Sequence, residues 1–74
     1  MDYRERIQVD PNVMLGKPII KGTRITVELI LRKLSEGAAV RDILDGYPHL
    51  RHEDVLAALS YGADVVSNEE VIAG

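Results

Sequence analysis

The sequence predicts a mainly helical domain in which a short N-terminal β-ribbon precedes a three-helix bundle of the helix-turn-helix kind. Near the N-terminus apolar and polar residues alternate, which is typical of a strand. The short segments 19–20 and 23–25, each of which ends in isoleucine, flank a Lys-Gly pair, and this two-residue spacing is typical of a hairpin. Farther along the chain, apolar residues recur at helical spacing. We therefore expect one small domain over residues 1–64 and a C-terminal tail over residues 65–74.

The β-ribbon is predicted over residues 7–25. Its first strand begins at Ile7 and stops at the turn-forming residues 10–12. Its second part is the hairpin, in which Lys21 and Gly22 form a two-residue turn and the glycine supplies a positive φ angle. The pattern then changes from strand-like to helical.

Three helices are predicted over residues 27–36, 40–46 and 52–64. In the first helix, one face is made of apolar residues at the i, i+3, i+4 and i+7 positions. These are Val27, Ile30, Leu31 and Leu34. Thr26 precedes this helix as its N-cap. The loops between the helices are short, which indicates a helix-turn-helix arrangement.

The chain is small for an independent domain. It has 74 residues and no cysteine, so neither a disulfide framework nor a thiolate metal site supplements the core. A domain of this size buries only about 60% of the surface that its unfolded chain exposes, and self-association is a common way to bury more. We therefore expect a homo-oligomer, either a dimer or a higher assembly. The small residues of the third helix belong to the core or to a dimer seam; they are Ala57, Ala58, Gly62 and Ala63.

Composition and the first residues predict a soluble cytoplasmic protein. Hydrophobic residues make up 46% of the chain, which is too many for a disordered protein. No segment approaches the run of about 20 apolar residues that crosses a membrane, so we expect no membrane partner. The start, MDYRERIQVD, is charged and lacks the apolar core of a signal peptide.

Charge is distributed unevenly along the chain. Residues 1–33 contain seven Lys/Arg and four Asp/Glu, whereas residues 34–74 contain two and eight. Because phosphate contacts need lysine and arginine, we expect any nucleic acid to bind at the N-terminal end. The candidate residues for binding a nucleic acid or another partner are Lys17, Lys21 and Arg24 of the hairpin. The alternative is that the charges belong to an ordinary mixed surface and that the hairpin is structural and pairs with a second copy.

The sequence lacks the patterns of a catalytic or metal site. Gly16 and Lys17 resemble the end of a phosphate-binding loop, but the full G-x-x-x-x-G-K-[ST] motif is missing and Pro18 removes a backbone donor. His49 and His52 straddle a turn and the start of a helix, so we interpret them as exposed residues near a helix cap. The chain has no cysteine nucleophile. We predict a binding protein and not an enzyme, with no cofactor and no metal ion.

Three segments together resemble a known family: GKPIIKGTRI, EGAAVRDILDGYPHL and EDVLAAL. Over about residues 7–63 the chain is similar to the small bacterial domain-of-unknown-function family four-three-three. The matching positions that we interpret as structural are Gly16, Pro18, Ile20, Gly22, Thr23, Tyr47, Pro48 and Leu50. The resemblance implies a homeodomain-like helical fold with a β-ribbon. Many members are classed, by inference, as antitoxins of the VapB type that are encoded beside a PIN-like ribonuclease.

Two positions depart from the pattern of that family. A hydroxyl residue commonly caps the second and third helices, whereas this chain has Ala39 and Arg51. The loss of a hydroxyl cap costs about 1 kcal/mol of stability. We therefore expect a somewhat weaker fold that association stabilises.

The resemblance implies the antitoxin of a type II toxin-antitoxin pair, which neutralises a PIN-like ribonuclease and autoregulates by binding DNA. Such ribonucleases hold divalent metal in a cluster of carboxylates, so an inhibitor can place a cation there or cover the entrance with an apolar segment. Arg24 is the candidate cation. The candidate partner-binding residues of the tail are Val65, Val66, Val71 and Ile72.

Two other functions fit the sequence: a stand-alone helix-turn-helix-like regulator that binds DNA, and an oligomerisation module with no nucleic-acid role. A helix-turn-helix reads base edges with the N-terminal residues of its last helix. Here that surface contains Glu53 and Asp54, which would oppose DNA phosphates, so we expect any DNA contact at the hairpin. An adjacent gene for a PIN-like protein would favour the antitoxin, and operator binding without such a gene would favour the regulator.

Overall fold

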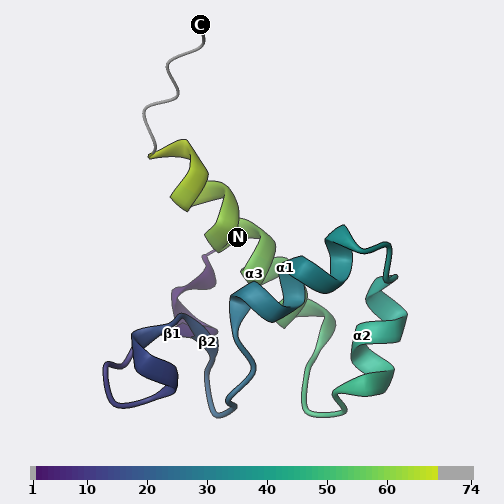
Figure 1. Ribbon diagram of the computed structural model, residues 1–74, viewed down its shortest axis with the longest axis horizontal. Helices are drawn as coiled ribbons and strands as arrows, with labels where there is room; N and C mark the ends of the chain where they lie inside the picture. The colour runs from purple at the N-terminus through teal and green to yellow at the C-terminus, as the bar shows by residue number, and fades with distance from the viewer. Residues whose placement is uncertain (1, 69–74) are drawn as a thin grey trace, which may run out of the picture.

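The structure is a computed structural model of the chain and describes residues 2–68. Two short 3-10 helices, two short strands and three α-helices follow one another (Figure 1). In chain order they are η1 (Tyr3–Glu5), β1 (Ile7–Gln8), η2 (Met14–Gly16), β2 (Ile19–Ile20), α1 (Val27–Ser35), α2 (Val40–Gly46) and α3 (His52–Ser67). The predicted fold class, a mainly helical domain with a short N-terminal ribbon, is confirmed.

The ribbon is antiparallel, but its pairing differs from the predicted hairpin. Ile20 of β2 pairs with Ile7 of β1, while the segment after the turn contributes a single bridge between Ile19 and Thr26. Thr26 already caps α1, so the chain enters a helix before a third strand can form. The ladder therefore joins β2 to the distant β1, and the predicted hairpin is a turn with one bridge.

Helix α1 begins and ends where local signals predict. The Thr26 hydroxyl oxygen accepts a hydrogen bond from the Leu29 N–H at 3.0 Å, which is an N-cap contact. At the other end Gly37 has a φ angle of 95°, a conformation that glycine adopts without strain. There the Ala38 N–H donates to the Lys33 carbonyl at 3.0 Å, as expected where a left-handed residue ends a helix.

Helices α2 and α3 lack a side-chain N-cap bond but keep the reciprocal bond of a capping box, in which a carboxylate accepts from the N-cap residue's own N–H. The Ala39 N–H donates to Asp42 Oδ2 at 2.9 Å, and the Arg51 N–H donates to Asp54 Oδ2 at 2.9 Å. Each aspartate is at the N3 position, so each supplies the N3 half of a capping box. Its charge also suits the positive end of the helix dipole.

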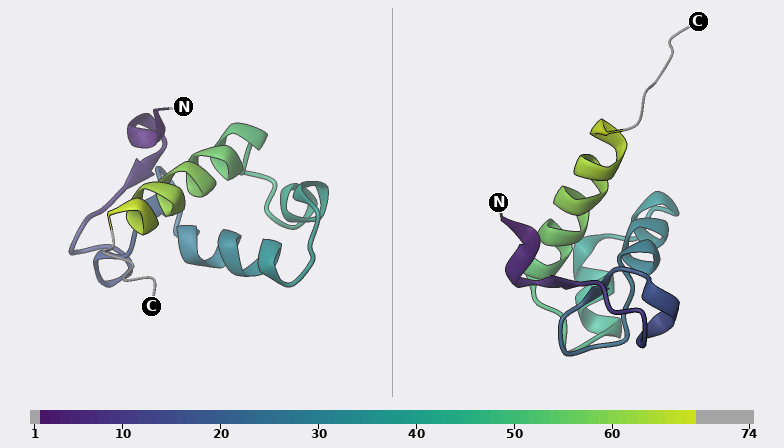
Figure 2. Two further views of the ribbon diagram at one scale, coloured as in Figure 1. Left: turned by 90° about the horizontal axis from the view of Figure 1, so that it is seen from above. Right: turned by 90° about the vertical axis from the view of Figure 1, so that its left-hand side faces the viewer.

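Helix α3 is longer than predicted, since it continues to Ser67 instead of ending near residue 64. Val65 and Val66 therefore lie in its last turns and not in a tail, and the Asn68 N–H donates to the Asp64 carbonyl at 3.2 Å. The helix continues because no Gly or Pro interrupts residues 63–67. The end of α3 extends beyond the other helices (Figure 2, right). The other two predicted tail residues, Val71 and Ile72, lie outside the described residues.

The core lies where α1, α2 and α3 meet the inner side of the ribbon. The ribbon and α2 are at opposite ends of the molecule, with α1 and α3 between them (Figures 1 and 2). Ala57 and Ala58 are fully buried, so these two small residues belong to the core, whereas Ala63 is exposed. The core cluster consists of Ile7, Ile20, Val27, Ile30, Ile43, Leu50, Val55, Ala57 and Ala58.

The N-terminal segment is attached to α3 at two points. The Tyr3 ring meets the Tyr61 ring edge-on, with 5.3 Å between the ring centroids. A hydrogen bond to the Asp64 carboxylate, with partial burial and the nearby negative charge, raises the pKa of Tyr3. Farther along, Arg6 Nη1 donates to Asp54 Oδ1 at 3.1 Å. Among the described residues, none of the helices is long and apolar enough to span a lipid bilayer.

Candidate functional site

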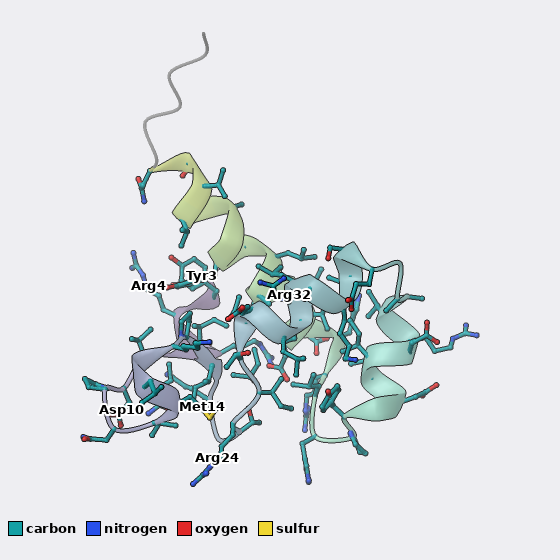
Figure 3. All side chains as sticks on the ribbon, viewed as in Figure 1. Tyr3, Arg4, Asp10, Met14, Arg24 and Arg32 are labelled. Atoms are coloured by element: carbon teal, nitrogen blue, oxygen red, sulfur yellow. The ribbon has the colours of Figure 1, made fainter. Side chains whose placement is uncertain are left out.

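The turn between β2 and α1, residues 20–25, holds two of the three predicted basic residues, and we call it the basic turn. Thr23 fixes its shape, because its hydroxyl donates to the Ile20 carbonyl at 2.7 Å and accepts from the Ile25 N–H at 3.0 Å. Lys21 and Arg24 are exposed. Arg24 extends away from the body of the molecule (Figure 3), so this turn presents cationic side chains to solvent.

The third predicted residue, Lys17, is held differently. Its Nζ lies 3.1 Å from Glu28 Oε1, and Glu28 Oε2 lies 3.3 Å from Arg32 Nε. The hydrogen bonds from Lys17 and Arg32 lower the pKa of Glu28. Lys17 therefore connects the chain before β2 to α1 and is partly neutralised. The three basic residues are therefore not equivalent, because Lys17 is in an ion pair with Glu28 whereas Lys21 and Arg24 are exposed on the basic turn.

The matching family positions lie at points that shape the chain. Gly16 and Gly22 have φ angles of 79° and 77°, which favour glycine. The Pro18 carbonyl accepts from the Val27 N–H at 2.9 Å and so joins the ribbon to α1. Ile20 and Leu50 are buried in the core. Tyr47 packs against that core, and Pro48 is exposed in the loop after α2.

The segment before Gly16 has a feature that sequence reasoning missed. Met14 and Leu15 both have positive φ angles, 49° and 58°, which are uncommon for residues other than glycine. Leu15 is 94% exposed. The sequence offers no signal for this conformation, because Gly16 alone marks the turn. Leu15 therefore has a strained backbone conformation and adds an exposed apolar side chain to the N-terminal surface.

An apolar groove of about 440 Å³ lies between α1 and the C-terminal half of α3. We call it the α1–α3 groove. Its apolar lining includes Pro18, Leu31, Gly62, Val65 and Val66. Gly62 leaves room for the Leu31 side chain, since a Cβ atom at this position would lie 3.1 Å from Leu31 Cδ1. Val65 and Val66 are 45% and 59% exposed, so the groove is open to solvent.

The rim of the α1–α3 groove is polar. Glu28, Arg32 and Ser35 line it from α1, and the first two form the ion pair described above. An apolar centre with a polar rim is the usual anatomy of a protein-protein interface. An amphipathic helix laid in a groove is one recurring form of such recognition.

The start of α3 is poorly suited to contact DNA phosphates. His52 and Glu53 are exposed there, whereas Asp54 is buried and paired with Arg6. Residues 2–68 contain no group of three or more His, Cys, Asp or Glu side chains that could hold a metal ion. The basic turn and the α1–α3 groove therefore remain as the candidate sites.

A family model for "Protein of unknown function (DUF433)" matches residues 7–62 of the chain. The chain belongs to this family. The crystal structure of a DUF433 member protein from Anabaena variabilis is similar, with a TM-score of 0.82 and 33% identity. That match covers 86% of this chain and 63% of the other, so this chain spans less than two thirds of the solved one. An uncharacterized protein of Archaeoglobus fulgidus is 61% identical over 28 residues, which are 38% of this chain and 78% of that protein.

Only part of the lining of the α1–α3 groove of this DUF433 protein lies within the region that matches the family model. Pro18, Leu31 and Gly62 lie within residues 7–62, whereas Val65 and Val66 lie beyond them. One wall of the groove therefore belongs to the family domain, and the extension of α3 completes the other wall.

Proposed function

We propose that this DUF433 protein is the antitoxin of a type II toxin-antitoxin pair and that it binds and neutralises a PIN-like ribonuclease. The observation that carries the proposal is the α1–α3 groove, an open apolar surface on a small domain. An open groove with an apolar floor and a polar rim has the form in which an amphipathic helix of another protein is commonly bound. The groove therefore supports a function in binding another protein.

In this proposal two surfaces contact the toxin, the α1–α3 groove and the basic turn. The groove holds an apolar helix of the toxin, with Val65 and Val66 against it. Arg24, on the basic turn, is exposed and free to extend, so it is suited to enter a cluster of carboxylates such as the one that holds metal in a PIN-like ribonuclease. A guanidinium placed there would form charge-assisted hydrogen bonds with those carboxylates.

Autoregulation by DNA binding is the second part of the proposal, and the exposure of Lys21 and Arg24 favours it. Both side chains are on the same turn, and phosphate contacts of this kind need no base-reading helix. The acidic start of α3 does not contact the DNA in this arrangement.

The proposal requires a gene for a PIN-like protein beside this one, and its test is RNA cleavage by the purified product of that gene, titrated with this DUF433 protein. We expect wild type to inhibit and Val65→Asp to inhibit at least tenfold more weakly, about 1.4 kcal/mol, because a carboxylate would be desolvated in the groove. Ser67→Asp is the control, since it adds the same charge to the same helix at a residue that does not line the groove.

Circular dichroism must show that both variants are folded. Equal inhibition by wild type and Val65→Asp would exclude the groove as the binding surface. No inhibition by wild type would exclude the antitoxin function itself.

A further inference from the structure

Helix α3 carries a second apolar surface that the α1–α3 groove does not explain. Leu56 and Leu59 are 42% and 44% exposed, Val66 is 59% exposed, and Ala63 is also exposed. These four residues follow one another at intervals of three, four and three, which is the spacing of the a and d positions in a helix-pairing seam. We call them the α3 seam. Only Val66 belongs to both surfaces.

We propose that two copies of the protein pair along the α3 seam with their α3 helices antiparallel. The four positions are symmetric about residue 61, so a two-fold axis there places Leu59 opposite Ala63 of the second copy. The same axis places Leu56 opposite Val66 of the second copy. Each large side chain thus meets a smaller one, which lets the two rows interdigitate, and both copies use the same patch, as a two-fold dimer requires.

Charge on α3 is compatible with this pairing. Glu53 and Asp64 are eleven residues apart, which is close to three full turns, so they lie along one line, and this line flanks the seam because Glu53 and Leu56 are three residues apart. The antiparallel arrangement also brings Arg51, at the start of α3, near the carboxyl end of the other α3. That end carries the negative part of the helix dipole, which favours a nearby cation.

The ribbon offers less for self-association than the seam does. Each strand has two residues. Ile19 of β2 already pairs with Gln8 on one side and bridges Thr26 on the other. Among the described residues, both edges of β2 are therefore occupied at Ile19, and the outer edge of β1 offers a second copy only two residues. The α3 seam has uncharged side chains along most of a helix of 16 residues.

The length of the seam limits the affinity. A helix of 16 residues is about 24 Å long at 1.5 Å per residue, and one helix contact of this length buries less than the standard protein-protein interface of about 1,600 Å² in total. Interfaces of the standard area already extend to micromolar affinity. The dimer is therefore a micromolar one that exchanges with monomer.

The test is sedimentation velocity over a concentration series from about 1 to about 100 µM. Leu59→Ala is expected to raise the dimer dissociation constant at least tenfold. The double variant Leu59→Ala with Ala63→Leu is expected to return it to within about threefold of wild type, because the pair keeps one leucine and one alanine with their places exchanged. Leu15→Ala is the matched control, since it truncates a more exposed leucine outside α3 and should leave the dimer unchanged.

Three results would overturn the proposal. A single 8.2 kDa species throughout the series would exclude the dimer. A double variant as weak as Leu59→Ala would exclude the antiparallel register. An equal loss with Leu15→Ala would place the interface elsewhere, provided that circular dichroism shows every variant to be folded.

Discussion

A buried carboxylate joins the N-terminal segment to α3. Asp54 is 6% exposed, and its two oxygens accept from Arg6 Nη1 and from the Arg51 N–H. A buried charged group left without a partner costs more than the pair contributes. The aspartate therefore depends on the arginine, whose side chain is 35% exposed.

We predict that Arg6→Ala lowers the free energy of unfolding by about 1–3 kcal/mol. The reason is that Asp54 would keep its backbone contact but lose the cation that balances its charge. Urea unfolding followed by circular dichroism measures the change. Arg4→Ala, on the same segment with an exposed side chain, should change stability by less than about 0.5 kcal/mol. Equal stability of Arg6→Ala and wild type would show that water solvates Asp54 adequately.

At the scale of single residues, the features that the sequence predicted correctly are those encoded by local signals. Thr26 and Gly37 lie at helix ends with the roles that their chemistry indicates. The contact of Lys17 with Glu28 and that of Arg6 with Asp54 join residues 11 and 48 positions apart, and no periodicity encodes such pairs. The positive φ angles of Met14 and Leu15 also follow from closing the loop between the strands and not from their own preferences.

Among the elements, the helices were predicted better than the ribbon. Helical spacing and caps are local, so the bounds of α1 and α2 agree with the prediction to within one residue. The partner of β2 is chosen by tertiary packing, which places Ile7 and Ile20 together in the core. The predicted end of α3 was wrong because residues 65–74 were assigned to a tail, whereas the helix continues to Ser67 and places Val65 and Val66 in the wall of the groove.

We predict that DNA binding, measured by fluorescence anisotropy on the DNA upstream of this gene, depends on the basic turn. Changing Lys17, Lys21 and Arg24 together to Ala should abolish measurable binding at physiological salt, and any residual binding should have a smaller salt slope. Lys17→Ala alone should do less, since Glu28 already holds that ammonium group.

The control is His52→Ala, which changes an exposed residue at the start of α3 and should leave the affinity nearly unchanged. If His52→Ala weakened binding more than the triple variant did, the DNA would lie on the helix-turn-helix and the basic turn would be structural.

Over the whole molecule, the helical class followed from the sequence but the two apolar surfaces did not. The α1–α3 groove needs Leu31 and Gly62 to face each other across two helices, which no linear pattern gives. The α3 seam has recognisable spacing, yet its exposure becomes evident only when Ala57 and Ala58 are seen to fill the core. Both surfaces reach the end of α3 and meet at Val66.

The geometry therefore predicts that toxin binding and dimer formation respond to different substitutions. Val65 lines the groove only, Leu59 lies in the seam only, and Val66 lies in both. Val65→Asp should weaken inhibition of the toxin and leave the dimer intact. Leu59→Ala should weaken the dimer and leave inhibition of the toxin intact. Val66→Asp should weaken both at least tenfold, since it places a carboxylate where the two surfaces meet. Cleavage assays and sedimentation on the same preparations measure the two effects. If Leu59→Ala also abolished inhibition, the toxin would require the dimer, and the two surfaces would act as one.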